Sequence, residues 1–295
     1  MNNYAIVTDS CSDLSKSFRD EHHIDYAKMM INWTDEKGEV HESIADLDWE
    51  VLSSKEFYDI IRRGIRIYTA QPAIQNYIDT FEKYLKQGKD VLYLACSSGL
   101  SASLHTAEML ANTELKDRYP NNKVVVIDTL RAGMSLGAMV MDAVLMHEAG
   151  KSMDEVIDFV NKEKLKYKEI GIPESLTYLK RAGRVTGPVA LMGNLIQLKP
   201  ILVFNDDGIN EAKEKAVGRK KAYLRMAEII KDDIVDPENQ TIYLMSADCR
   251  DEDINGFKNA ILNQVKVKEI VVQPLGPIIG AVSGPGTIIL NYKGK

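Results

Sequence analysis

The stretch Leu92–Ala107 constrains the fold most, because it joins an uninterrupted apolar run to a dense cluster of small polar residues. Val91–Cys96 has the length of one strand, and such an unbroken run is typical of a strand buried on both faces of a parallel sheet. Leu100–Asn112 then places its apolar residues at helical spacing. The turn between them supplies the small polar residues Ser97, Ser98, Gly99 and Ser101. The stretch therefore predicts a strand, a polar turn and a helix in immediate succession.

A strand, a small-residue turn and a helix start can together bind an anion. The first N–H groups of a helix have no intrahelical partner, and the helix dipole adds partial positive charge. Serine hydroxyls in the turn can donate further hydrogen bonds. The simpler alternative is that Ser97 or Ser98 only caps the helix. This stretch by itself leaves both interpretations open.

The order of patterns along the chain predicts two domains. Residues 1–150 alternate strand and helix patterns, which indicates a parallel sheet covered on both faces. Gly150-Lys151 interrupts the alternation, and Ser152–Glu155 is a capping box that starts a new helix. Residues 151–295 mix helices with hairpin patterns around turns such as Asn205–Gly208. We therefore predict an α/β protein with an N-terminal parallel-sheet domain over 1–150 and a C-terminal α+β domain, with a mostly antiparallel sheet, over 151–295.

The composition restricts the partners of this chain. Its 295 residues carry a formal charge of −6 without any basic tract, so we do not expect it to bind nucleic acid. No segment approaches the roughly 18 apolar residues that span a bilayer, and the N-terminus lacks the regions of a signal peptide. Cys11, Cys96 and Cys249 are too widely spaced for a metal-ligand pair or a disulfide framework. We expect a cytoplasmic protein with at most transient membrane contact and without a metal or cofactor.

Sequence signatures of catalysis are mostly absent. The chain has no G-x-S-x-G nucleophile elbow, no Walker A loop, no dinucleotide fingerprint and no H-E-x-x-H motif. Its histidines are scattered along the chain. Cys96 ends an apolar strand, which favours a buried and inert thiol over a nucleophile. These patterns assign no catalytic residue.

Hydroxyl groups and one arginine remain as candidate ligand-binding groups. Thr69 ends an extended segment just before Pro72, which favours the first turn of a helix, while Ser98 and Ser101 lie in the polar turn. Arg184 follows a glycine, which allows a tight turn that presents the guanidinium. The planar fork of arginine matches the two oxygens of a carboxylate or phosphate, although a salt bridge across the domain boundary is an equal alternative. Together these groups predict a site for a small anion or a carboxylate.

Six short motifs occur in an informative order and spacing: Val7–Leu14, Thr69–Pro72, Ser97–Ser101, Val126–Thr129, Leu179–Val185 and Gly280–Gly286. With these motifs the chain resembles the DegV family of bacterial fatty-acid-binding proteins along essentially its full length. The resemblance implies two α/β domains with one long-chain fatty acid in a tunnel between them. In several members of that family the protein is the binding subunit of a fatty acid kinase, and it presents the carboxylate to an ATP-dependent kinase partner.

The resemblance also implies roles for individual residues. By motif, Thr69 and Ser101 contact the carboxylate of the fatty acid, and Ser98 and Arg184 are supporting donors. A protein of this kind needs no catalytic residue of its own, because the chemistry belongs to the kinase. Most members have a histidine near the ligand head group where this chain has Val282. A lipid binder that is uncoupled from the kinase is therefore a second hypothesis.

Two other functions stay open as alternatives. A serine hydrolase or acyltransferase would use Ser98 or Ser101 with His105, although His105 lies only four residues after Ser101 and no acid partner is apparent. A phosphoryl-transfer protein would need a histidine at the end of a strand, and the sequence offers none. The fatty-acid carrier is the interpretation that we favour.

Overall fold

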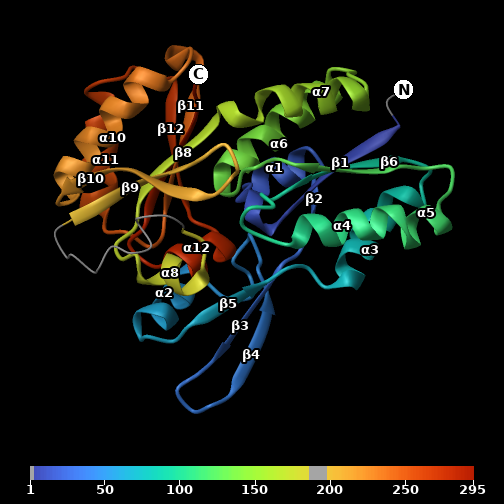
Figure 1. The fold of residues 1–295 in the computed structure, drawn as a ribbon, viewed down its shortest axis with the longest axis horizontal. Coiled ribbons are helices and arrows are strands. Elements are labelled where there is room, and N and C mark those ends of the chain that lie inside the picture. The colour runs from blue at the N-terminus through green and yellow to red at the C-terminus, as the bar shows by residue number, and fades with distance from the viewer. Residues whose placement is uncertain (1–2, 186–197) are drawn as a thin grey trace.

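The computed structural model describes residues 3–185 and 198–295 (Figure 1). Its first domain is built on a sheet in which all neighbouring strands are parallel. The strands are, in spatial order, β2 (Asp25–Ala27), β1 (Tyr4–Asp9), β6 (Asp90–Ala95) and β7 (Val124–Asp128). This confirms the parallel-sheet domain that the alternating sequence pattern predicts.

Successive residues of β6 face opposite sides of this sheet, and both sides are buried. Tyr93 packs in one apolar cluster with α3 (Ile74–Leu85) and α4 (Ser103–Asn112). Leu92 and Leu94 pack in another cluster with α6 (Gly133–Glu148) and α7 (Met153–Glu163). The helix α7 follows residue 150 in the chain but packs on α6. Helices on both faces explain why β6 has no polar alternation.

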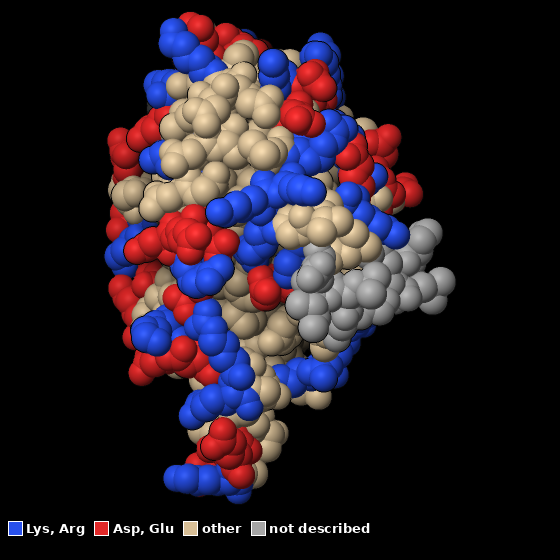
Figure 2. Space-filling view, turned by 90° about the vertical axis from the view of Figure 1, so that its left-hand side faces the viewer, with Lys and Arg blue, Asp and Glu red and all other residues tan. Residues whose placement is uncertain are grey.

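Shorter elements complete the first domain. They are the one-turn helices η1 (Ser10–Ser12) and η2 (Lys164–Lys166) with the helices α1 (Lys16–Glu21), α2 (Ser54–Arg62) and α5 (Glu114–Arg118). A separate antiparallel sheet consists of β4 (Val40–Ile44), β3 (Met30–Thr34) and β5 (Ile67–Ala70). The β3–β4 hairpin protrudes at the bottom of Figures 1 and 2, and acidic and basic side chains are interspersed over the face in Figure 2.

The second domain contains a larger sheet, and among its strands in residues 167–185 and 198–295 only β11 and β12 pair in parallel. Its strands are, in spatial order, β10 (Asn210–Val217), β9 (Leu198–Phe204), β8 (Tyr167–Ile172), β13 (Ile288–Lys293), β11 (Thr241–Ser246) and β12 (Glu269–Pro274). The remaining elements are α8 (Thr177–Ala182), α10 (Arg219–Asp233), η3 (Pro237–Asn239), α11 (Asp251–Leu262) and α12 (Pro277–Ser283). The mostly antiparallel second domain is therefore confirmed.

The large sheet is also covered on both faces, and this arrangement creates the site. Residues such as Ile170 and Ile172 pack beneath α10 and α11. Met245 and Ile289 point the other way and join the apolar cluster of α6 and α7 in the first domain. The helix α12 contacts α2, β5 and η1, so a segment near the C-terminus packs into the first domain. The two domains thus meet across one face of the large sheet.

Candidate functional site

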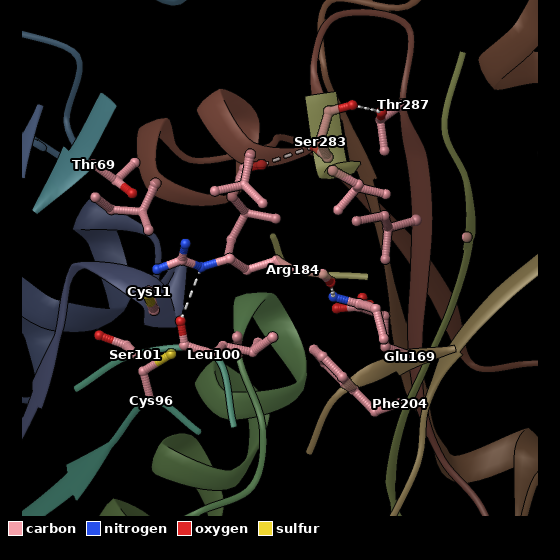
Figure 3. Close-up of a pocket in the computed structure, with 18 of the residues that line it drawn as sticks. Cys11, Thr69, Cys96, Leu100, Ser101, Glu169, Arg184, Phe204, Ser283 and Thr287 are labelled. Carbon is pink, nitrogen blue, oxygen red and sulfur yellow. Dashed lines mark hydrogen bonds between the residues drawn. The ribbon is translucent and has the colours of Figure 1, made fainter. Parts of the chain in front are cut away.

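A cavity lies where the large sheet faces the first domain (Figure 3). It contains about 1100 Å³ of empty space, part of it open to solvent. Most of its walls are apolar, and they come from β8, β9, β13, α12 and the first-domain turns. The apolar lining residues include Met29, Leu100, Ala132, Ile172, Leu179, Leu202, Phe204, Ile278, Ile279, Val282 and Ile289.

The two hydroxyls expected to bind a carboxylate both line this cavity. Thr69 is half-buried in β5, where the strand pairs with Ile31 of β3. Ser101 is half-buried just before α4, and its Oγ accepts a hydrogen bond from the Ser103 N–H at 3.2 Å. That bond uses only a lone pair of the Ser101 oxygen, so the hydroxyl proton can still be donated to a ligand. Thr69 and Ser101 lie on the same side of Figure 3.

Arg184 lines the same cavity, and its guanidinium extends toward Thr69 and Ser101 in Figure 3. Gly183 ends α8 with φ of 69°, a left-handed conformation that favours glycine and turns the chain as predicted. The Nε of Arg184 donates to the Leu100 carbonyl at 3.1 Å. Within the described residues Arg184 forms no ion pair, so it connects the domains through a carbonyl and not through the salt bridge that was the alternative interpretation.

Ser98 does not lie among the described residues that line the cavity. Its Oγ donates instead to Oδ2 of Asp128 at 2.5 Å, and the same carboxylate accepts the Ser98 N–H at 3.2 Å. The Ser97 hydroxyl donates to the Gly208 carbonyl at 2.9 Å. Neither serine caps the helix, because α4 begins only at Ser103. The capping alternative is therefore wrong, and both serines stabilise the turn.

His105 lies away from the cavity. Its side chain is exposed on α4 and lies 3.3 Å from Oε2 of Glu108. The hydrolase alternative required His105 beside Ser98 or Ser101 as a base for a serine nucleophile. The structure instead points this histidine to solvent, so it supplies no base to the cavity.

The two cysteines at the first-domain turns line the cavity, but their thiols are buried and favour the protonated form. Both Cys11 and Cys96 are almost fully buried. A hydrogen bond to Cys96 and burial raise the pKa of the Cys11 thiol well above its usual range. Burial also leaves the pKa of Cys96 raised, against the opposing effect of its hydrogen bond to Cys11. High thiol pKa values disfavour the thiolate, which agrees with the inert role predicted for Cys96.

Val282 lies on α12 at the boundary between two cavities. It lines the main cavity, and with Thr69 and Arg184 it also lines a smaller neighbour with about 670 Å³ of empty space. Arg66 and Arg181 belong to the wall of this second cavity. A valine at this position contributes apolar surface beside the hydroxyl groups and no hydrogen-bond donor.

Sequence analysis missed Glu169, which is a polar group in the wall of the main cavity. Burial, and then the charge of Asp13, raise the pKa of Glu169 to about 8. The signal was present in β8, because Tyr167, Glu169 and Gly171 alternate with the core residues Ile170 and Ile172. The alternation in the sequence of β8 therefore marks Glu169 as an acidic residue on the face that lines the cavity.

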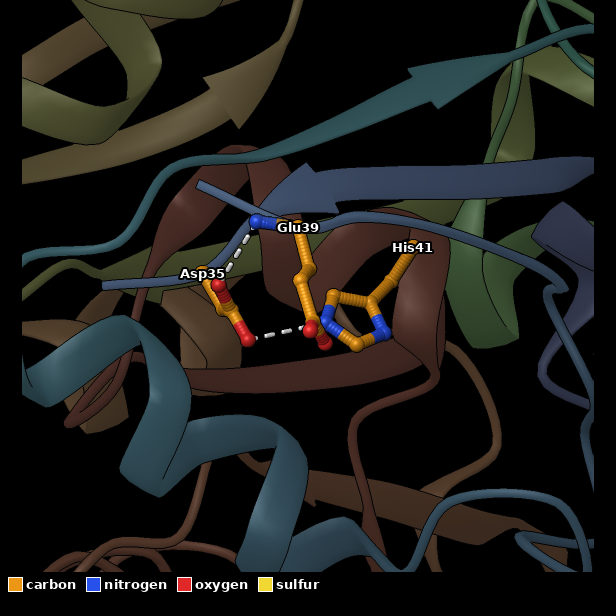
Figure 4. A group of neighbouring side chains, drawn as sticks. All are labelled: Asp35, Glu39 and His41. Carbon is orange, nitrogen blue, oxygen red and sulfur yellow. Dashed lines mark hydrogen bonds and ion pairs between the residues drawn. The ribbon is translucent and has the colours of Figure 1, made fainter. Parts of the chain in front are cut away.

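One group of side chains among the described residues has the spacing of metal ligands (Figure 4). It consists of Asp35, Glu39 and His41 at the end of the β3–β4 hairpin. The Asp35 carboxylate accepts the N–H groups of Lys37 and Glu39, each at 2.9 Å, and lies 3.1 Å from Nε2 of His41. These bonds are those of an ordinary hairpin turn.

No helix in the described part of the chain is both long and apolar enough to cross a membrane. The fold and the site together define a two-domain α/β protein with a largely apolar cavity between its domains and hydrogen-bond donors at one side of that cavity. A family model described as "Uncharacterised protein, DegV family" matches residues 3–292. The chain belongs to the DegV family.

Individual relatives agree over the full length of the chain. A DegV domain-containing protein of Clostridium perfringens is 35% identical over 294 residues, covering 100% of this chain and 98% of the relative. A solved structure described as fatty acid binding of a DegV family protein from Thermus thermophilus is 26% identical, with a TM-score of 0.83 and 99% of both chains covered. A DegV lipid-binding protein from Thermotoga maritima is also 26% identical, with a TM-score of 0.82, covering 99% of this chain and 98% of that one.

Proposed function

We propose that this protein binds one long-chain fatty acid in the main cavity, with the carboxylate at Thr69 and Ser101. The observation that carries this proposal is the distribution of polarity in one cavity. The hydroxyls of Thr69 and Ser101 and the guanidinium of Arg184 lie on one side, and apolar side chains form most of the remaining wall. The hydroxyls of Ser283 and Thr287, on the other side, donate to backbone carbonyls of the protein itself. The fatty-acid binding of the Thermus thermophilus relative supports the choice of ligand.

The energetics of such a ligand fit this distribution. A carboxylate that leaves water loses its hydration, so it needs several hydrogen bonds to offset the cost. Thr69 and Ser101 are hydroxyl donors for it, and the positive charge of Arg184 favours its ionised form. Each methylene of the acyl chain contributes about 0.8 kcal/mol when buried, so a long chain supplies most of the affinity.

The protein acts as a carrier in this proposal and performs no chemistry itself. It operates in the cytoplasm and presents the carboxylate to an ATP-dependent fatty acid kinase, without a metal or cofactor of its own. The smaller cavity beside Thr69, Arg184 and Val282 supports this role, because it adjoins the proposed carboxylate site. Val282 favours a competing outcome in which the lipid is bound but phosphorylated slowly, since valine offers no donor there.

The first experiment is native mass spectrometry of the protein purified from a bacterial host, followed by extraction and identification of the bound molecule. We expect a stoichiometric long-chain fatty acid. Thr69→Ala and Ser101→Ala each remove one donor, so each should weaken binding about 5- to 100-fold in a fluorescent fatty-acid displacement assay.

The matched control is Ser98→Ala, because the Ser98 hydroxyl binds Asp128 outside the cavity. This variant should bind fatty acid like the unmodified protein. An apo mass, together with no thermal stabilisation by added fatty acids, would overturn the proposal. Equal loss of affinity in Ser98→Ala and Ser101→Ala would place the carboxylate elsewhere.

A further inference from the structure

Glu169 is a carboxyl group in the wall of a cavity that is otherwise suited to a hydrocarbon chain. It lies on β8, on the face that looks away from α10 and α11 and toward the first domain. Gly171, two residues further along the same face, also lines the cavity and has no side chain to cover Glu169. In Figure 3, Glu169 lies on the opposite side of the cavity from Thr69 and Ser101. The carboxyl therefore faces a part of the cavity distant from the proposed carboxylate site.

A second buried carboxyl, Asp13, lies close behind Glu169. A β-carbon placed on Gly133, the first residue of α6, would lie 3.3 Å from Oε2 of Glu169 and 3.9 Å from Oδ2 of Asp13. Asp13 is only 6% exposed, and neither of its oxygens accepts a hydrogen bond from a side chain in the described part of the protein. Burial raises the pKa of Asp13 to about 8, against the opposing effect of the Gly276 amide. Two acids this close to one another, away from bulk water, favour the protonated form of at least one.

No basic side chain in the described part of the structure forms an ion pair with Glu169. Arg131 is the nearest source of positive charge, and its effect lowers the pKa of Glu169 only partly. Its guanidinium is engaged with carbonyl groups, through Nε to Tyr167 at 2.6 Å and through one terminal nitrogen to Leu165 at 3.0 Å. The hydrogen-bonding capacity of Glu169 is therefore directed to the cavity.

We propose that Glu169 is a binding subsite for an oxygen substituent on the acyl chain, so that the cavity selects hydroxy fatty acids over unsubstituted ones. This inference rests on the proposed function, because it requires a fatty acid with its carboxylate at Thr69 and Ser101. A plain hydrocarbon chain would leave the Glu169 carboxyl against methylenes without a partner, which is unfavourable. A hydroxyl on the chain satisfies the carboxyl and is itself satisfied by it.

The chemistry of the subsite favours a hydroxyl over other polar groups. A second carboxylate on the ligand would be repelled whenever Glu169 or Asp13 is ionised. A hydroxyl can donate to an ionised carboxylate and accept from a protonated carboxyl, so it matches Glu169 in either state. Because the subsite is fixed in the wall, the preference should depend on which carbon carries the hydroxyl.

The test measures dissociation constants of the delipidated protein for octadecanoic acid and for hydroxyoctadecanoic acids that differ in the position of the hydroxyl. At least one hydroxy isomer should bind the unmodified protein more tightly than octadecanoic acid does. Glu169→Leu should reverse this order, and the ratio of the two dissociation constants should change by about tenfold or more. Glu169→Gln keeps a hydrogen-bonding group and should retain the preference for the hydroxy isomer.

The control is Glu269→Leu, which changes an exposed glutamate on β12 outside the cavity and should leave the ratio unchanged. Thermal unfolding of each variant shows that it is folded before binding is compared. If octadecanoic acid binds as well as every hydroxy isomer, the subsite is wrong and the fatty-acid site survives. If neither kind of acid binds the unmodified protein, the proposed function itself fails.

Discussion

The buried acids near the cavity predict that this protein loses stability as the pH rises from about 5 to 8. Burial raises the pKa of Glu169 and of Asp13 to about 8, so both groups hold protons in the folded protein that they release in the unfolded chain at neutral pH. The unfolded state then binds fewer protons than the folded state, and the free energy of unfolding falls with rising pH. The stabilising contribution is complete below the ordinary carboxyl pKa and is lost as the pH approaches about 8.

The magnitude follows from the number of protons. One group that is protonated in the folded state and ionised in the unfolded state changes the free energy of unfolding by about 1.4 kcal/mol per pH unit. Glu169→Gln removes one such group and should make the slope shallower by up to about 1.4 kcal/mol per pH unit between pH 5 and 8. At pH 8 the variant should therefore be more stable relative to the unmodified protein than it is at pH 5.

Urea unfolding at several pH values between 5 and 8.5, followed by circular dichroism, measures this slope at roughly half-unit intervals. Glu269→Gln is the control, because Glu269 is exposed on β12 and lies outside the cavity. Parallel pH profiles for the unmodified protein and Glu169→Gln would refute the reasoning, since Glu169 would then ionise alike in both states.

Three further substitutions test the turn, the domain contact and the carboxylate site. Ser98→Ala removes the hydroxyl that donates to Oδ2 of the half-buried Asp128. The free energy of unfolding, measured in urea, should fall by about 1–3 kcal/mol, and an unchanged value would contradict this hydrogen bond. Gly280→Ala places a β-carbon against the Tyr58 hydroxyl, which itself donates to the Leu275 carbonyl at 2.8 Å. The clash should lower stability by about 1–3 kcal/mol, measured in the same way, and an unchanged stability would show that α12 shifts freely. Val282→His should raise the rate of acyl phosphate formation with ATP and a bacterial fatty acid kinase, because it adds a donor beside Thr69; an unchanged rate would show that Val282 does not limit the transfer.

The fold was predictable because its two larger sheets leave different patterns in the sequence. The apolar run in β6 requires cover on both faces, and the structure supplies helices on both sides of that strand. The large sheet is also covered on both faces, but one of its covers is another domain. Two residues of β8 that face this second cover, Glu169 and Gly171, read as ordinary polar or small residues. The alternation in β8 shows that these residues share one face, but the segment that covers this face is distant in sequence, so the cavity beside it could not be inferred.

The proposed carboxylate site was predictable to the extent that its residues lie in local motifs. Thr69 lies near the end of β5 and Ser101 lies just before α4, and both residues line the cavity. Ser98 lies in the same turn but makes a bond to Asp128, 30 residues away in sequence. Side-chain direction within a turn depends on such contacts, so spacing could not separate Ser98 from Ser101.

Glu169 shows why a polar residue in a buried strand is informative about ligands. A leucine at this position would fill the wall of a purely hydrocarbon cavity without the cost of a buried carboxyl. The carboxyl also lies beside Asp13, which makes its ionisation still less favourable. A cavity that binds only methylene groups is not stabilised by a carboxyl in its wall. A ligand with an oxygen on its acyl chain, in contrast, forms a directed hydrogen bond with Glu169. The unfavourable position of Glu169 in the free protein is therefore the feature that distinguishes a selective cavity from a general one.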